Sequence, residues 1–259
     1  MQRELNFMNY DCQEYSKSLK AAIKDDNDPD VPGVSLVQLE SLTVPSQVEN
    51  GTVPYIILDC PYSLNPGEKD GMVLKWYLNS VTVPIYQWIP PSHPQGLGAM
   101  RGRIDLDFEI SSDPYTRHRA LYIYNPTVEM SGEYTCKVST LENEVSVTSN
   151  MVVYSPPRHL GMQHRRTSYS TVNISCMVDH VFPRPDVRMY HGQGVARTRI
   201  KGVKEALYRY PDGAWQVLLF IVLDDSSLRI ENLFQCEMAL PHTNYRLARS
   251  TIYSPSKLQ

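Results

Sequence analysis

Four of the five cysteines have the spacing of two long-range disulfide bridges. Cys60 and Cys136 form one widely separated pair, and Cys176 and Cys236 form a second pair with a similar gap. Zinc sites typically use closely spaced Cys-x-x-Cys doublets, so this pattern argues against a metal site and predicts one disulfide in each of two modules. On the chain-entropy model each bridge contributes about 4 kcal/mol to stability, less any strain.

Two further motifs predict chemistry of an extracellular kind. Asn50-Gly51-Thr52 and Asn173-Ile174-Ser175 are acceptor sequences for N-linked glycans. Disulfides and glycans both form in the secretory pathway, so we expect an extracellular or cell-surface location.

The chain ends do not show how the protein would reach that location. Residues 1–30 are polar and charged and contain no secretory signal, and no run of about 20 apolar residues could span a membrane. We interpret the start as truncated or mis-started, and residues 254–259 as either a true end or a cut before an anchor. Membrane association would therefore need an anchor that is not present in this chain.

No pattern in the sequence predicts catalysis, so we do not expect an enzyme, a cofactor or a metal. The seven histidines lack metal-ligand spacing, and there is no Gly-x-Ser-x-Gly nucleophile motif. The glycine-rich run at 96–102 precedes a strand rather than a helix and is interpreted as a turn. Cys12 lies in a polar segment with no identifiable base and is interpreted as a stray thiol.

The charge balance argues against nucleic acid as a partner. The formal net charge is −3 and the isoelectric point is near 6.2, whereas phosphate binding needs a concentrated basic surface. The one basic cluster, His164-Arg165-Arg166, is interpreted as a solvated strand edge.

The pattern along the chain predicts an all-β protein. Residues 1–33 lack an apolar period and are expected to be a flexible leader, after which short β-rich runs alternate with turn residues. The proline-containing stretch 155–158 predicts a stiff linker between two modules, at 34–154 and 159–255. The expected strands are 53–60, 73–77, 84–89, 103–108, 120–123, 134–138 and 145–154, then 172–176, 186–190, 207–210, 215–223, 233–238 and 247–253.

Alternation within these strands predicts which side chains face the core. Trp76 is expected to point inward, and Lys75 and Tyr77 outward. In 172–176 the apolar residues are expected inside, which leaves Asn173 outside and available for a glycan.

The first module resembles a variable-type domain of the immunoglobulin superfamily. The resemblance is carried by Cys60, Trp76 and the run Ser131-Gly132-Glu133-Tyr134-Thr135-Cys136. It implies that the tryptophan packs against an inter-sheet disulfide and that the tyrosine hydroxyl bonds back to the backbone. Met130 stands where the family usually has an acidic residue, so the resemblance does not imply the family's salt bridge to an arginine such as Arg103.

The second module resembles a constant-type domain, which implies two tandem immunoglobulin-like β-sandwiches. Tyr190 stands where the family has tryptophan, and Phe234 replaces the tyrosine two residues before Cys236. The arrangement is similar to the beaten-path group of arthropod cell-surface recognition proteins. That likeness implies neuronal guidance or cell adhesion through binding another immunoglobulin-type receptor.

The resemblance also implies a binding face on the first module. Strands carrying Trp76 and Cys136 share a sheet in variable-type domains, so their outward side chains should share a face with those of the neighbouring strand. Exposed aromatic residues are enriched at interfaces. The expected partner-binding residues are Lys75, Tyr77, Tyr86, Trp88, Thr135 and Lys137.

Two alternatives remain open at the level of sequence. Tyr86 and Trp88 could fold over the sheet edge as part of the core. The chain could also be an intracellular structural module of the muscle-filament kind, with free thiols and no glycan.

Overall fold

The computed structural model describes residues 37–255 of the chain. The expected leader at 1–33, Cys12 and the last four residues lie outside the described residues. Within the described part, strands dominate and the helices are short 3-10 turns. These turns are Pro66–Glu68, Gly98–Met100, Val128–Met130, Gly194–Ala196 and Asp225–Ser227.

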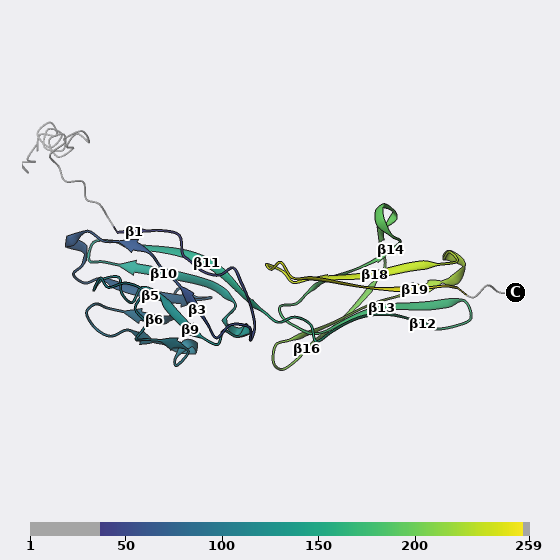
Figure 1. Ribbon diagram of the computed structural model, residues 1–259, viewed down its shortest axis with the longest axis horizontal. Coiled ribbons are helices and arrows are strands. Elements are labelled where there is room, and N and C mark those ends of the chain that lie inside the picture. Colours follow the sequence, from purple (N-terminus) through teal and green to yellow (C-terminus); the bar gives the residue numbers. More distant parts are fainter. Residues whose placement is uncertain (1–36, 256–259) are drawn as a thin grey trace, which may run out of the picture. The chain divides into compact units, whose positions relative to one another are not determined.

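The first β-sandwich is built from β1 to β11 (Figure 1). A six-stranded sheet has the order β2-β11-β10-β5-β6-β7, a three-stranded sheet has the order β3-β9-β8, and β1 pairs with β4. The bounds are β1 Gln38–Leu39, β2 Gln47–Glu49, β3 Tyr55–Leu58, β4 Tyr62–Ser63, β5 Val73–Leu78, β6 Pro84–Trp88, β7 Gln95–Gly96, β8 Ile104–Asp105, β9 Leu121–Tyr124, β10 Gly132–Ser139 and β11 Glu144–Tyr154.

A disulfide joins the segment after β3 to β10 and so ties the two sheets together. Cys60 and Cys136 are bonded, and both are fully buried. Trp76 lies directly opposite Cys136 in the β5–β10 register and is also fully buried. This is the packing of tryptophan against an inter-sheet disulfide that the resemblance implies.

Tyr134 closes the turn that precedes β10. Its ring is buried, and its hydroxyl donates a 2.8 Å hydrogen bond to the carbonyl oxygen of Met130. Met130 is itself buried in the core, and Arg103 forms no ion pair among residues 37–255. In the same sandwich Arg119 instead makes two hydrogen bonds to the carboxylate of Asp59, at 2.9 and 3.0 Å.

The strand expected at 103–108 is shorter in the structure. Only Ile104 and Asp105 pair with β9, and the Asp105 carboxylate then accepts a hydrogen bond from the backbone N–H of Asp107 at 3.0 Å. This aspartate side chain offers the backbone a turn in place of the sheet ladder, so the strand ends there.

Tyr86 and Trp88 belong to the core of the first sandwich, so their expected exposure is wrong. In the β5–β6 register Tyr86 lies opposite Trp76 and Trp88 lies opposite Leu74, which places both on the inward face. Trp88 is only 1% exposed. A pattern of alternation fixes which residues share a face, but the register with the neighbouring strand decides which face is inside.

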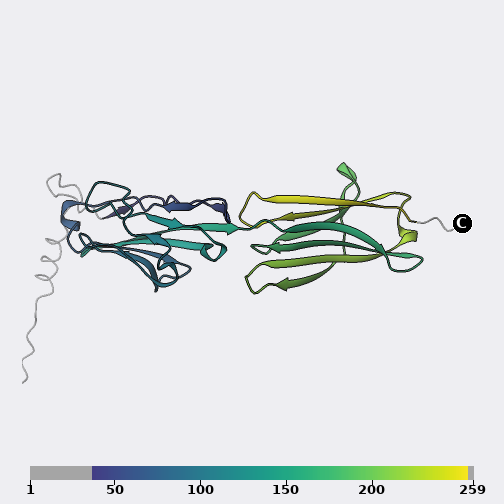
Figure 2. The same ribbon diagram turned by 60° about the horizontal axis from the view of Figure 1, so that its bottom comes forward.

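The second β-sandwich is built from β12 to β19 and encloses a separate core. One sheet has the order β12-β13-β17-β16 and the other β15-β14-β18-β19, with β18 and β19 shown in yellow in Figure 2. Cys176 on β13 and Cys236 on β18 are bonded across the two sheets. The bounds are β12 His159–Arg166, β13 Thr171–Val181, β14 Asp186–His191, β15 Thr198–Arg199, β16 Lys204–Arg209, β17 Trp215–Asp224, β18 Asn232–Ala239 and β19 Arg246–Tyr253.

Met189, rather than Tyr190, takes the place beside the second disulfide. Met189 lies opposite Cys236 in the β14–β18 register and is buried, just as Trp76 lies opposite Cys136. Tyr190 faces the other way, with the guanidinium of Arg197 3.7 Å from its ring centroid. The assignment of Tyr190 to the tryptophan position is therefore shifted by one residue.

Phe234 is fully buried and stacks on His191, but it has no hydroxyl to bond the backbone. Asn232, two residues earlier, supplies polar contacts at this end of β18. Its Nδ2 donates to the carbonyl oxygens of Arg229 and Tyr253, at 2.8 and 3.3 Å, and its Oδ1 accepts from the N–H of Arg229 at 3.1 Å. A buried amide with these partners holds the turn that a tyrosine holds in the first sandwich.

We expect Tyr134→Phe to lower the free energy of unfolding by about 1–2 kcal/mol, because the buried Met130 carbonyl loses its donor. Tyr154→Phe is the matched control, since the Tyr154 hydroxyl contacts Glu49 at a half-buried site. Chemical denaturation of both variants measures the difference. Equal stabilities for the two variants would contradict this account of the turn.

We expect Trp88→Ala to lower the free energy of unfolding by about 3–5 kcal/mol, because it leaves a cavity in the core. Tyr55→Ala, at a position 44% exposed, is the control, with an expected loss of about 1 kcal/mol or less. The comparison uses thermal or denaturant unfolding. A stable Trp88→Ala variant would show that this side chain does not pack as described.

Candidate functional site

The six expected partner-binding residues lie on β5, β6 and β10, which are adjacent strands of the six-stranded sheet. The structure therefore brings them into one sheet, although not onto one face. Tyr86 and Trp88 point into the core, where they hold nearby loops. The Tyr86 hydroxyl donates to the His118 carbonyl at 2.8 Å, and Trp88 Nε1 donates to the Ser92 carbonyl at 3.1 Å.

Tyr77 and Thr135 lie on the outer side of the sheet but are each only 5% exposed, so their expected exposure is also wrong. They are cross-strand partners, and neighbouring side chains cover them. Thr135 Oγ1 is 2.9 Å from Thr148 Oγ1, and the Lys137 ammonium lies 6.0 Å from the centroid of the Tyr77 ring. Tyr77 and Thr135 therefore lie beneath other side chains and contribute little exposed surface.

Lys75 and Lys137 form the charged part of the outer face. They are directly opposite each other in the β5–β10 register, and both are half-buried. Lys137 Nζ contacts Glu144 Oε1 at 2.7 Å, and Ser139 donates to the other oxygen of Glu144 at 2.8 Å. Among residues 37–255 Lys75 has no ion pair.

The electrostatics of this lysine pair follow from those contacts. The hydrogen bond to Glu144 raises the pKa of Lys137, and the hydrogen bonds from Lys137 and Ser139 lower the pKa of Glu144. The charge of Lys75 also lowers the pKa of Glu144, although only Lys137 pairs with that carboxylate. Like charges at directly opposite positions destabilise a sheet.

The exposed aromatic residues of the first sandwich lie on the opposite, three-stranded sheet. Tyr55 stacks on Tyr122 with ring centroids 4.4 Å apart, and Phe108 and Tyr124 each lie 5.2 Å from Tyr122. A hydrogen bond from the Tyr124 hydroxyl to Asp105 raises the pKa of Tyr124 to about 12. The alternation in 53–60 could have indicated part of this cluster, because it places Tyr55 on the face opposite Ile56 and Leu58.

The two glycan acceptors occupy different settings. Asn50 is exposed in the turn after β2, where its Nδ2 donates to Ser155 Oγ at 3.1 Å. Asn173 lies on the outer face of β13 and is half-buried, with an Oδ1 atom that is buried without a hydrogen-bond partner. Glycosylation at both positions stays a prediction.

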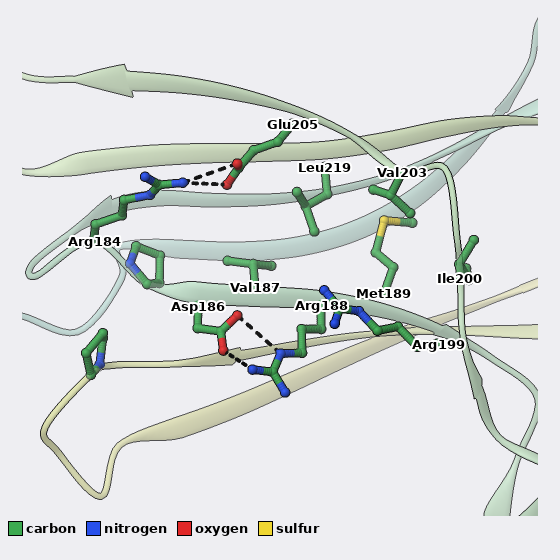
Figure 3. A pocket seen from close by; sticks show the side chains of 12 residues that line it. Arg184, Asp186, Val187, Arg188, Met189, Arg199, Ile200, Val203, Glu205 and Leu219 are labelled. Carbon is green, nitrogen blue, oxygen red and sulfur yellow. Dashed lines mark hydrogen bonds and ion pairs between the residues drawn. The ribbon is translucent and has the colours of Figure 1, made fainter.

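A groove of about 490 Å³ lies in the second sandwich beside β14 and β16 (Figure 3). Its floor is apolar, with Met189 and Leu219 among its residues, and its rim carries paired charges. Arg184 makes two 3.2 Å hydrogen bonds to Glu205, and Arg188 bonds the carboxylate of Asp186. The residues that line the groove include no serine, cysteine or histidine.

Metal sites and membrane-spanning helices are both absent from residues 37–255. No group of three or more His, Cys, Asp or Glu side chains is placed to hold a metal ion. No helix in that part of the chain is long and apolar enough to cross a membrane.

Known proteins resemble this chain in structure but not detectably in sequence. No family model and no curated protein matches the sequence. A crystal structure of bovine butyrophilin is similar with a TM-score of 0.63 and 16% identity, covering 83% of this chain and 97% of that one. A chain from a crystal structure of ICOS with ICOS-L and an anti-ICOS-L VNAR domain is similar with a TM-score of 0.56 and 14% identity, covering 79% and 97%. Together with the sheet orders and the two disulfides, these likenesses confirm the predicted fold of two tandem immunoglobulin-like β-sandwiches.

Proposed function

We propose that this chain is an extracellular recognition protein that binds a protein partner through the outer face of its six-stranded sheet. The proposed domains are a variable-type domain at 34–154 and a constant-type domain at 159–255. Three strands beyond β10 on one side, β5, β6 and β7, are typical of the variable type, and a β12-β13-β17-β16 sheet facing β14, β18 and β19 is typical of the constant type. The second domain acts as a spacer.

The opposed lysines are the observation that carries the proposal. Lys75 and Lys137 are cross-strand partners on the outer face of the sheet, and among residues 37–255 only Lys137 pairs with a carboxylate, that of Glu144. A partner that places an additional carboxylate between them would relieve the repulsion between the two ammonium groups. We therefore infer an acidic group at the centre of the partner's contact surface.

The wider setting of the proposal rests on the fold and on the resemblance. The similar structure of ICOS in complex with ICOS-L and an anti-ICOS-L VNAR domain is an assembly of proteins, so a similar fold takes part in protein–protein binding there. The likeness to the beaten-path group supports an immunoglobulin-type cell-surface partner and a role in neuronal guidance or adhesion.

We expect the double variant Lys75→Ala, Lys137→Ala to bind the partner about tenfold more weakly, since it removes two charges that meet a carboxylate. A pairwise screen against extracellular domains identifies the partner, and surface plasmon resonance at several salt concentrations measures the affinity. The thermal midpoint should change little, because the double variant removes the cross-strand like charge together with the partly exposed Lys137–Glu144 ion pair. Lys204→Ala, on exposed β16 of the second sandwich, is the matched control. Unchanged affinity and salt dependence in the double variant would overturn the proposed face.

The compartment has its own test, which separates the proposal from the structural-module alternative. We expect the protein isolated from cells that express it to lose mass with a glycosidase, and its four core cysteines to react with a thiol reagent only after reduction. Mass spectrometry before and after each treatment measures both. Free thiols at Cys60, Cys136, Cys176 and Cys236, with bare Asn50 and Asn173, would instead establish the intracellular module.

A further inference from the structure

One strand of the second sandwich is apolar on both of its faces. In β17 the residues Val217 and Leu219 are buried in the core, so the alternate residues Leu218, Phe220 and Val222 face outward. Val222 is 55% exposed, and Leu218 and Phe220 are half-buried. An antiparallel sheet normally presents polar residues on its solvated side, so this side of the β12-β13-β17-β16 sheet departs from the rule.

The neighbouring strand extends this surface. Met177 on β13 lies opposite Leu218, and it is half-buried on the same side. We call the surface formed by Met177, Leu218, Phe220 and Val222 the outer apolar face. Contiguous exposed apolar surface of this kind on a soluble protein marks a place that something else covers.

The glycan acceptor motif lies beside the outer apolar face. Asn173 is the cross-strand partner of Val222, and Ser175 is the partner of Phe220. Directly opposite residues have Cβ atoms about 5 Å apart, and diagonal neighbours such as Asn173 and Phe220 about 7–8 Å. A sugar attached to Asn173 therefore begins within contact distance of two of the four apolar side chains.

The side-chain amide of Asn173 has its two polar atoms in different settings. Its Oδ1 is buried without a hydrogen-bond partner, whereas Nδ2, the atom that carries an N-linked sugar, is not among the buried unpaired atoms of residues 37–255. On the other flank Arg165 is the β12 partner of Asn173 and is exposed, so its guanidinium can donate to sugar oxygens.

We infer that an N-linked glycan on Asn173 lies over the outer apolar face, with the C–H faces of its inner sugars against Phe220 and Val222. The inference rests on the proposed extracellular location, since glycans are added in the secretory pathway. A glycan at Asn173 also stands where a second copy of this sheet would have to pack, so it keeps the outer apolar face from self-associating. The surface concerned is in the second sandwich and is separate from the lysine face of the first.

The test uses the full chain, secreted from eukaryotic cells behind an added signal sequence. Asn173→Gln and Ser175→Ala each abolish the motif, and Asn50→Gln removes the other acceptor as a matched control in a polar turn. We expect Asn173→Gln and Ser175→Ala to raise the fluorescence of a dye that binds exposed apolar surface by about twofold or more. Both should also self-associate in sedimentation velocity, whereas Asn50→Gln should behave as the parent does. Adding Val222→Ser to Asn173→Gln should reverse most of the change.

Several outcomes would overturn the inference. These are an Asn173→Gln variant that matches Asn50→Gln, a parent that carries sugar on Asn50 but not on Asn173, or a fully glycosylated parent that dimerises through Val222. If Asn173→Gln fails to fold, enzymatic removal of the glycan from the folded parent provides the same comparison. Because the added signal sequence imposes secretion, these results do not depend on the native compartment, which the mass measurement on the native protein decides separately.

Discussion

The disulfide between Cys60 and Cys136 is the constraint on which the first sandwich depends. It holds β10 and the segment that follows β3 at a fixed separation, and Trp76 packs at the same level because it lies opposite Cys136 in the β5–β10 register. Once that level is fixed, the inward and outward faces of β5, β6 and β10 are fixed as well. The position of Lys75 and Lys137 on the outer side is a direct consequence of Trp76 and Cys136 lying inside.

The two sandwiches make equivalent core contacts with different residues. Tyr134 and Asn232 both bond the backbone before a core strand, one with a hydroxyl and the other with an amide. Trp76 and Met189 both lie opposite a disulfide cysteine. The flexible thioether side chain of Met189 can fill an irregular space, whereas the rigid indole of a tryptophan needs a cavity that matches its shape. The second core therefore fills the position beside its disulfide with a smaller, non-aromatic side chain.

The sequence was sufficient for the fold, the two disulfides and the alternation of side chains within most strands, because alternation and cysteine spacing are local signals. It was insufficient for register. Tyr190 and Met189 are adjacent, and only pairing with β18 shows which of them faces Cys236. Tyr86 and Trp88 likewise alternate correctly, but their partners Trp76 and Leu74 place them inside. Burial on the outer face was also beyond the pattern, because Tyr77 is covered by side chains from β10 that lie far away in sequence.

Because Met189 stands where the first sandwich has Trp76, the two sandwiches differ in their tryptophan fluorescence. The chain has three tryptophans, and two of them, Trp76 and Trp88, are fully buried in the first core. The third, Trp215, is half-buried at the edge of the second core, with Arg209 5.5 Å from its ring. Opening of the first sandwich therefore moves two indoles from an apolar core into water, and opening of the second moves one that already has polar surroundings. Intrinsic fluorescence thus reports mainly on the first sandwich, while tyrosine and far-ultraviolet signals include both.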